Sequence, residues 1–219
     1  MTKKQIFYTG FFIVLALAFY LVLSAVIPGF NKRSVPPVSY IRPFSFLTQD
    51  GQRFTEKDVA GKVYVAEYFF TTCKGICPKM NRNMKTVFEK FKNENDFMIL
   101  SHTVDPDTDS VGRMKQYADS MGADSKKWVF LTGRKDSLYS AARLSYLLDD
   151  PKNNNGNMEE QFIHTQFFAL VDKNGSVRRI YDGLKQDELN ELMKDIDKLL
   201  AEQGNEKRSV NSLFNNNPQ

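Results

Sequence analysis

Residues 63–80 read VYVAEYFFTTCKGICPKM, and they hold both cysteines of the 219-residue chain, Cys73 and Cys77. The segment Val63–Phe70 is almost continuously apolar, β-branched or aromatic, which is typical of a central strand that is buried on both faces. Pro78 directly follows the second cysteine and suits the first turn of a helix. The stretch therefore predicts a buried strand that leads through a cysteine loop into a helix.

A helix is expected over Pro78–Lys92, where apolar residues recur at helical spacing. Met80 and Met84 belong to this pattern, together with valine and phenylalanine residues. Methionine fills gaps in hydrophobic cores because its side chain is flexible. We therefore interpret both methionines as core residues and not as metal ligands.

The remaining segments alternate between strand and helix patterns. Strands are expected at 44–47, 96–104, 128–132, 162–172 and 176–181, and helices at 110–121, 136–147 and 186–202. Ser110 suits the N-cap of its helix, and Asn174-Gly175 indicates a hairpin between the last two strands. This alternation predicts an α/β domain whose helices flank a central sheet. The closing hairpin makes that sheet mixed.

The N-terminal segment Ile6–Ile27 contains 22 residues without a charge. A helix of that length reaches about 33 Å, enough to cross the hydrocarbon core of a bilayer. Because Lys3 and Lys4 precede it, we expect a single-pass anchor in the cytoplasmic (inner) membrane, with the domain on the periplasmic or extracytoplasmic side. A cleaved signal peptide is the alternative, but the apolar run is long for one. Both interpretations place the cysteines where disulfides form readily.

The chain is expected to divide into an anchor (1–30), a short proline-bearing tether (31–43), one domain (44–202) and an Asn-rich disordered tail (203–219). The formal net charge is +4, and the basic residues are scattered along the chain. A nucleic-acid-binding domain normally concentrates its basic residues. We therefore expect no nucleic-acid partner.

The cysteine loop is expected at the carboxyl edge of the sheet, where open α/β sheets bind their ligands. The dipole of the following helix, with Lys74 and Lys79, predicts a lowered thiol pKa there. Residues at i and i+4 share one face of a helical turn, so Cys73 and Cys77 can bring their sulfurs together. A redox pair and a shared metal ion both remain open at this point. A purely structural disulfide would close too short a loop to add much stability.

A third metal ligand would have to come from elsewhere, and the chain has two histidines, His102 and His164. Two thiolates and one imidazole form a soft ligand set that suits copper, especially Cu(I). Zinc would normally seek a fourth ligand. His102 lies in a predicted strand, and we interpret it as structural.

Three aspartates alternate in the segment that follows the second predicted strand, at positions 105, 107 and 109. Alternating carboxylates are a feature of calcium loops, but the glycine and the closing glutamate of an EF-hand are absent from this segment. We interpret the segment as a solvated turn that caps the next helix.

Four segments, in their order and spacing, resemble the Sco/SenC family: VYVAEYFFTTCKGICPKM, TVDPDTDS, WVFLTG and HTQFFALVD. The resemblance covers about residues 43–200. It implies a thioredoxin-like domain held at the membrane. It also implies a copper chaperone that helps to assemble the two-copper centre of cytochrome c oxidase, or a thiol-disulfide reductase acting on the cysteines of that centre.

Carried over by position, the resemblance implies that Cys73, Cys77 and His164 bind the metal, with Asp105 as a nearby supporting carboxylate at best. Many family members have Pro-Asp between the cysteines, where this chain has Lys74-Gly75-Ile76. The substitution makes the loop more cationic and more flexible. It removes none of the three implied ligands.

Two main functions follow from these observations. A metallochaperone would bind Cu(I), and in a second form Cu(II), and would pass the ion to a copper-accepting cytochrome c oxidase subunit. A thiol-disulfide oxidoreductase would use Cys73 and Cys77 without metal and would not need His164. Either function needs a thiol reductant as a partner and the membrane as a platform. A peroxide-reducing thiol enzyme is a third, weaker interpretation.

Overall fold

The computed structural model describes residues 2–26, 37–149 and 166–202, in two units that are described separately here. The first unit contains helix α1 (Lys3–Val26). Most of its side chains are both apolar and exposed. Within the described residues, α1 is the single helix that is long and apolar enough to span a membrane, a criterion that a signal sequence also meets.

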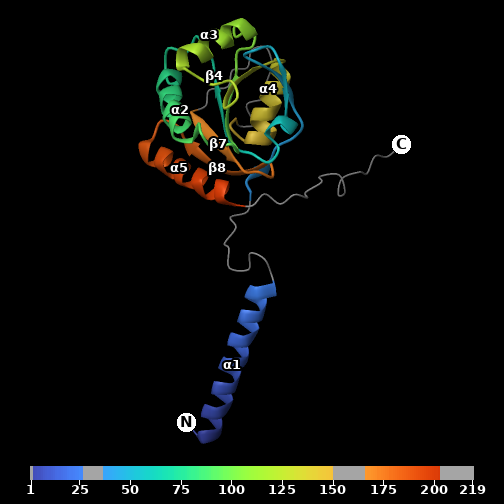
Figure 1. The fold of residues 1–219 in the computed structure, drawn as a ribbon, viewed down its shortest axis with the longest axis vertical. Coiled ribbons are helices and arrows are strands. Elements are labelled where there is room, and N and C mark those ends of the chain that lie inside the picture. The colour runs from blue at the N-terminus through green and yellow to red at the C-terminus, as the bar shows by residue number, and fades with distance from the viewer. Residues whose placement is uncertain (1, 27–36, 150–165, 203–219) are drawn as a thin grey trace, which may run out of the picture. The chain divides into compact units, whose positions relative to one another are not determined.

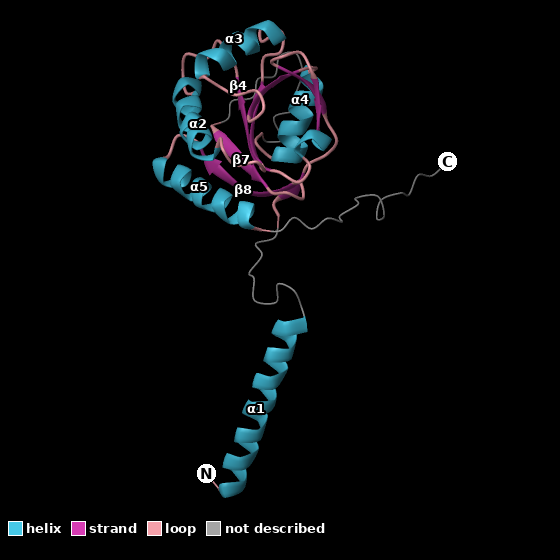
Figure 2. Cartoon of the chain, viewed as in Figure 1, coloured by secondary structure: helices cyan, strands magenta, loops and turns pink. Residues whose placement is uncertain are grey.

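The second unit is built on an eight-stranded mixed sheet (Figures 1 and 2). Its strands are β1 (Ser39–Tyr40), β2 (Ser45–Thr48), β3 (Arg53–Thr55), β4 (Val63–Phe69), β5 (Phe97–Thr103), β6 (Trp128–Thr132), β7 (Phe167–Val171) and β8 (Ser176–Asp182). They are arranged in the order β1-β8-β7-β4-β5-β6-β2-β3. The central strands β4, β5 and β6 are parallel, and the remaining pairs are antiparallel. The carboxyl ends of the three parallel strands therefore meet at one edge of the sheet.

Helices cover both faces of this sheet (Figure 1). They are α2 (Cys77–Phe91), α3 (Val111–Met121), α4 (Lys135–Ala141) and α5 (Gln186–Ala201), with a short 3-10 helix, η1 (Glu56–Val59). Residues of α2, α3 and α5 pack into one hydrophobic cluster, whereas residues of α4 pack into a second cluster. The sheet thus separates two cores.

Strand β4 supplies both cores because its side chains alternate between the faces. Val65 and Phe69 belong to the cluster beneath α2, and Tyr64 and Tyr68 belong to the cluster beneath α4. All seven residues of β4 are buried, which is the pattern of a central strand. By the same alternation, Glu67 lies on the α2 face.

The predicted elements are confirmed with small shifts at their ends, and the predicted helix 136–147 is the largest exception. It is regular only to Ala141, continues as the π-helical turn η2 (Ala142–Tyr146), and ends at Leu147 with a φ of 54°. The wider turn carries the ring of Tyr146 into the core, 5.2 Å from the ring of His102. The π-turn is thus the last turn of this helix, with Leu147 as its left-handed cap.

Two short strands were not predicted, because strands of two or three residues are too short to show a periodic pattern. β1 lies within the segment expected to be a tether, and its residues pair with β8. β3 pairs with β2 and completes a hairpin around Asp50-Gly51. The hairpin predicted around Asn174-Gly175 is confirmed by the antiparallel pairing of β7 with β8. Residues 162–165 of the predicted strand and the expected tail, 203–219, lie outside the described residues.

Candidate metal centre

The cysteine loop begins where β4 ends and closes where α2 begins. The backbone N–H of Cys73 donates to the carbonyl of Phe70 at 3.2 Å, so the chain turns directly after the strand. Cys77 is the first residue of α2, and Pro78 follows it in the first turn, as predicted. Both cysteines are free thiols: Cys73 is half-buried, whereas Cys77 is only 4% exposed. The two thiols lie close enough for the Cys73 side chain to affect the pKa of Cys77.

The predicted lowering of the thiol pKa is wrong for Cys77. Burial, with a smaller contribution from the Cys73 side chain, raises the pKa of Cys77 to about 12. The partial positive charge at the start of α2 acts in the opposite sense, but desolvation of a thiolate in an apolar site costs more. In the reduced, metal-free protein Cys77 is therefore a neutral thiol.

A buried carboxyl group lies on the same face of β4 as α2. Glu67 has no exposed surface, and burial raises its pKa to about 7, although a hydrogen bond from Ser101 opposes this shift. Its second oxygen, Oε2, has no hydrogen-bond partner in the described part of the chain. The Glu67 charge acts on Cys77 electrostatically and raises the pKa of its thiol. Sequence analysis missed this role, because Glu67 lies within an otherwise apolar strand.

His102 lies on the opposite face, as a structural residue. It has no exposed surface, its ring stacks on Tyr68 with centroids 4.8 Å apart, and its Nδ1 lies 3.3 Å from the carbonyl oxygen of Glu67. Burial lowers the pKa of His102 to about 4, so the ring is neutral. Because Tyr68 belongs to the cluster beneath α4 and Cys77 to the cluster beneath α2, the sheet separates His102 from the thiols.

His164 lies outside the described residues. The chain is described again from Gln166, directly before β7. In the antiparallel register of β4 and β7, Ala66 pairs with Ala169. Continuing that register by three residues brings Gln166 level with Phe69, the last residue of β4. The chain therefore enters β7 at the edge of the sheet that carries the cysteine loop.

Hydrogen bonds link this point to the cysteine helix. The N–H of Gly183 donates to the carbonyl of Gln166 at 2.8 Å, and the carbonyl of Gly183 accepts from Asn83 Nδ2 at 2.7 Å. Asn83 belongs to α2. Gln166 is therefore tied through a single residue to the helix that begins at Cys77.

Asp109 was expected in a solvated turn, and this expectation is wrong. Its side chain has no exposed surface, whereas Asp107 is exposed. Asp109 accepts hydrogen bonds from the backbone and the hydroxyl of Thr71 and from the hydroxyl of Thr103. These donors satisfy a carboxylate that burial would otherwise penalise. The only sequence signal was a threonine near the end of each parallel strand.

A metal site cannot be completed from the described residues alone. Within them, no group of three or more His, Cys, Asp or Glu side chains is placed to hold a metal ion. A cavity of about 1010 Å³ lies between the β2–β3 edge of the sheet and α4, but neither cysteine lines it. Within the described residues, the two thiols thus offer two metal ligands.

Comparisons with known proteins agree with this architecture. The SCO1/SenC family model matches residues 33–201. The SCO1 protein homolog of Bacillus subtilis (strain 168) is 33% identical over 162 residues, which cover 73% of this chain and 83% of that protein.

Two solved structures share the fold. BsSco, described as having a disulfide switch and as a member of the Sco family of cytochrome c oxidase assembly proteins, is 29% identical with a TM-score of 0.65, over 78% of this chain and 100% of that chain. Arabidopsis thaliana ScoI, solved with copper bound, is 25% identical with a TM-score of 0.58, over 74% of this chain and 98% of that chain. The mixed sheet flanked by helices is the thioredoxin-like fold expected from the sequence. By family match and by fold, the chain belongs to the SCO1/SenC family.

Proposed function

We propose that this protein is a membrane-anchored copper metallochaperone that holds its cargo with Cys73, Cys77 and His164. It delivers copper to the copper-accepting subunit of cytochrome c oxidase. The observation that carries the proposal is the meeting of two free thiols at the sheet edge where the chain enters β7 at Gln166. His164 precedes Gln166 by two residues, a span of at most about 7 Å.

The chemistry of the thiols supports a soft, singly charged ion. A metal binds cysteine as the thiolate, so binding must release the Cys77 proton that burial retains. The positive charge of copper compensates the negative charge that the buried site would otherwise disfavour. With two thiolates and a neutral imidazole, Cu(I) leaves a net charge of −1 and Cu(II) leaves none. Both oxidation states therefore fit the ligand set, and sulfur favours Cu(I).

Relatives support the cargo and the acceptor. Arabidopsis ScoI was solved with copper bound, and BsSco is described as belonging to a family of cytochrome c oxidase assembly proteins.

The apolar helix α1 confines the protein to the membrane, with the domain on the extracytoplasmic side of the inner membrane. Transfer then proceeds by exchange of Cys73 and Cys77 for cysteines of the acceptor.

A thiol-disulfide reductase is the second candidate function. The two free thiols lie close enough for the Cys73 side chain to affect the pKa of Cys77, which supports a redox pair, and BsSco is described as having a disulfide switch. In this function the pair passes two electrons to a disulfide of the acceptor and is reduced again by a thiol reductant. His164 has no part in it.

The variants His164→Ala and Cys77→Ser separate the two functions in the full-length protein in detergent. Cu(I) affinity is measured by competition with a chromophoric chelator, and reduction of a disulfide peptide is followed in parallel. We expect His164→Ala to lower copper affinity at least about tenfold and to leave disulfide reduction intact. Cys77→Ser should abolish both activities.

Two outcomes would contradict the chaperone. One is a Cys77→Ser variant that binds stoichiometric copper with native affinity. The other is a His164→Ala variant that keeps native copper affinity, because the ion would then not need the imidazole. If the second outcome is accompanied by loss of disulfide reduction, neither function as proposed here is correct.

A further inference from the structure

The carboxylate of Asp109 is a buried charge with no role in the function proposed above. It lies in the loop between β5 and α3, directly before the helix cap Ser110, and its side chain has no exposed surface. Buried carboxylates are rare unless they are paired or fully hydrogen-bonded. The partners of Asp109 therefore indicate what this charge does.

Asp109 joins the carboxyl ends of all three parallel strands. Its Oδ1 accepts from the hydroxyl of Thr71, just beyond β4, and its Oδ2 accepts from the backbone N–H of Thr71 at 3.1 Å. The same Oδ2 accepts from Thr103 Oγ1, at the end of β5, at 2.6 Å. The Asp109 backbone carbonyl accepts from Thr132 Oγ1, at the end of β6, at 2.9 Å. Asp109 thus accepts hydrogen bonds from one threonine at the end of each parallel strand.

The direction of every hydrogen bond in this cluster is fixed. Arg113 Nε donates to Thr71 Oγ1 at 2.6 Å, so the Thr71 hydroxyl is free to give its one proton to Asp109. The N–H of Asp105 donates to Thr103 Oγ1 at 2.9 Å, so the Thr103 proton also goes to Asp109. Both carboxylate oxygens act only as acceptors. In Asp109→Asn, the N–H groups of the amide would face groups that also donate, so hydrogen bonds would be lost.

The charge of Asp109 has a partner at the surface. Arg113 Nε lies 3.8 Å from Asp109 Oδ1, and the Arg113 side chain is 46% exposed. The guanidinium reaches the carboxylate mainly through the Thr71 hydroxyl that lies between them. The three side chains form a chain of charge-assisted hydrogen bonds, which are stronger than neutral ones.

We propose that Asp109 is the positioning residue of the cysteine loop: by holding Thr71 against the ends of β5 and β6, it sets where Cys73 meets Cys77. Thr71 precedes Cys73 by two residues, a reach of at most about 7 Å. The backbone turn from Phe70 to Cys73 starts on one side of this anchor and ends on the other. A shift of Thr71 therefore moves the Cys73 sulfur, while Cys77 stays fixed in α2. The effect on copper rests on the proposed function, whereas the effect on the thiol pair does not.

The threonines allow a matched test in the full-length protein. Thr71→Val removes a hydroxyl that binds Asp109 at the cysteine loop, and Thr103→Val removes one that binds the same carboxylate away from the loop. Asp109→Asn removes the acceptor itself. For each variant we measure the thiol-disulfide equilibrium of Cys73 and Cys77 against a glutathione or dithiothreitol buffer without metal. Cu(I) affinity and the free energy of unfolding are measured on the same samples.

Thr71→Val should shift the thiol-disulfide equilibrium about tenfold toward the two thiols, because the Asp109–Thr71 hydrogen bonds hold Cys73 beside Cys77 and their loss lowers the effective concentration of one sulfur at the other. For this two-electron couple a tenfold shift equals about 30 mV. Cu(I) affinity should fall about tenfold, as for other residues that orient metal ligands. Thr103→Val should lose comparable stability but change both quantities clearly less than Thr71→Val does, because Asp109 stays bound to Thr71 and Thr132. Asp109→Asn, where it folds, should match or exceed Thr71→Val.

The proposal is overturned if Thr71→Val and Thr103→Val change the thiol-disulfide equilibrium equally, or if neither changes it. In that case Asp109 serves only stability. If the wild-type protein binds no copper, the proposed function fails, but the metal-free equilibrium still decides whether Asp109 positions the loop.

Discussion

The Oε1 atom of Glu67 lies 2.5 Å from the hydroxyl oxygen of Ser101, inside the core beneath α2. Trp128 Nε1 donates to the same Ser101 oxygen at 2.8 Å, so the serine proton is directed to the carboxyl group. This single donor does not compensate the burial of a charge, and the pKa of Glu67 is raised to about 7. Glu67 is therefore a neutral acid in mildly acidic solution and a buried, poorly solvated anion above neutrality.

Replacing Glu67 with Gln should make the unfolding free energy less dependent on pH. The folded protein retains the Glu67 proton up to about pH 7, whereas an unfolded chain releases it near 4.5, the ordinary pKa of a glutamate. The proton that Glu67 retains in the folded state contributes its full stabilisation below about pH 4.5. This contribution is lost as the pH rises to about 7. The loss amounts to at most about 3.4 kcal/mol. Chemical unfolding at pH 5, 6, 7 and 8 measures it.

His102 acts in the opposite sense and must be separated from Glu67. Its folded pKa of about 4 lies below 6.5, the ordinary pKa of a histidine, so its contribution to stability rises with pH between these values. Wild type and Glu67→Gln share His102, so the difference between their curves isolates Glu67. Parallel curves for the two proteins would show that Glu67 is ionised throughout this range.

Alkylation should distinguish the two thiols of the reduced protein. Cys77 is 4% exposed, and burial raises its pKa to about 12, so only about one molecule in 10,000 carries a Cys77 thiolate at pH 8. Cys73 is half-buried and open to the reagent. We expect iodoacetamide to modify Cys73 at least about tenfold faster, as measured by peptide mass spectrometry. Equal rates would mean that the loop opens readily and exposes both sulfurs.

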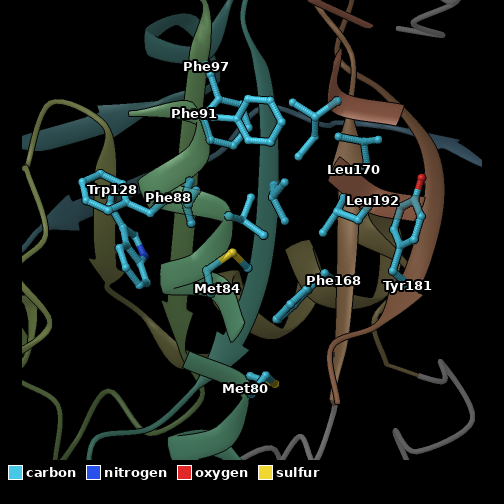
Figure 3. Packing of buried hydrophobic residues seen from close by; sticks show 14 of the residues in the cluster. Met80, Met84, Phe88, Phe91, Phe97, Trp128, Phe168, Leu170, Tyr181 and Leu192 are labelled. Atoms are coloured by element: carbon cyan, nitrogen blue, oxygen red, sulfur yellow. The ribbon is translucent and has the colours of Figure 1, made fainter. Parts of the chain in front are cut away.

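Met84 should act through packing alone. It has no exposed surface and belongs to the cluster beneath α2, where Figure 3 shows it among the buried side chains between Met80 and Phe88. Met84→Ala should cost about 2–5 kcal/mol of unfolding free energy, and Met84→Leu less than about 1.5 kcal/mol. Copper affinity of the Leu variant should stay native. A large loss of copper affinity in Met84→Leu would indicate that the Met84 thioether takes part in copper binding.

The sequence predicted the elements with strong periodicity and missed those that depend on tertiary contacts. The strand at 63–70 and the helix at 78–92 were identified because burial on one or both faces leaves a regular apolar pattern. The π-turn that carries Tyr146 into the core leaves no such pattern, because it responds to the rings around it. Local propensity yields to packing at such positions.

The candidate site divides in the same way. Cys73 and Cys77 were identified by spacing and by their place after a strand. The raised pKa of Cys77 and the buried carboxylate of Asp109 were not, because both depend on which groups the fold places around them. Charged residues near a helix end can be found in the sequence, and they predict how the helix end shifts a pKa. The shift caused by burial depends on how deeply the fold buries the group, which the neighbouring residues in the sequence do not reveal. His164 stays a prediction.

Gly183 should be required for the entry of the chain into β7, and Gly183→Ala tests this. A Cβ at this position would lie 2.6 Å from Phe168 Cζ and 2.8 Å from the carbonyl oxygen of Gln166. The backbone oxygen cannot rotate away, so we expect a loss of about 1–3 kcal/mol of unfolding free energy. Because the displaced segment leads back to His164, copper affinity should also fall, by at least about threefold.

A matched control is available at Gly112 in α3, where a Cβ would meet no atom within 4 Å. Gly112→Ala should raise the unfolding free energy by about 0.5–1 kcal/mol, because alanine loses less backbone entropy in a helix. It should leave copper affinity unchanged. If Gly183→Ala lowers stability but binds copper with native affinity, the contact between Gly183 and Gln166 does not position the third ligand. In that case the link from β7 through Gly183 to α2 serves the fold alone.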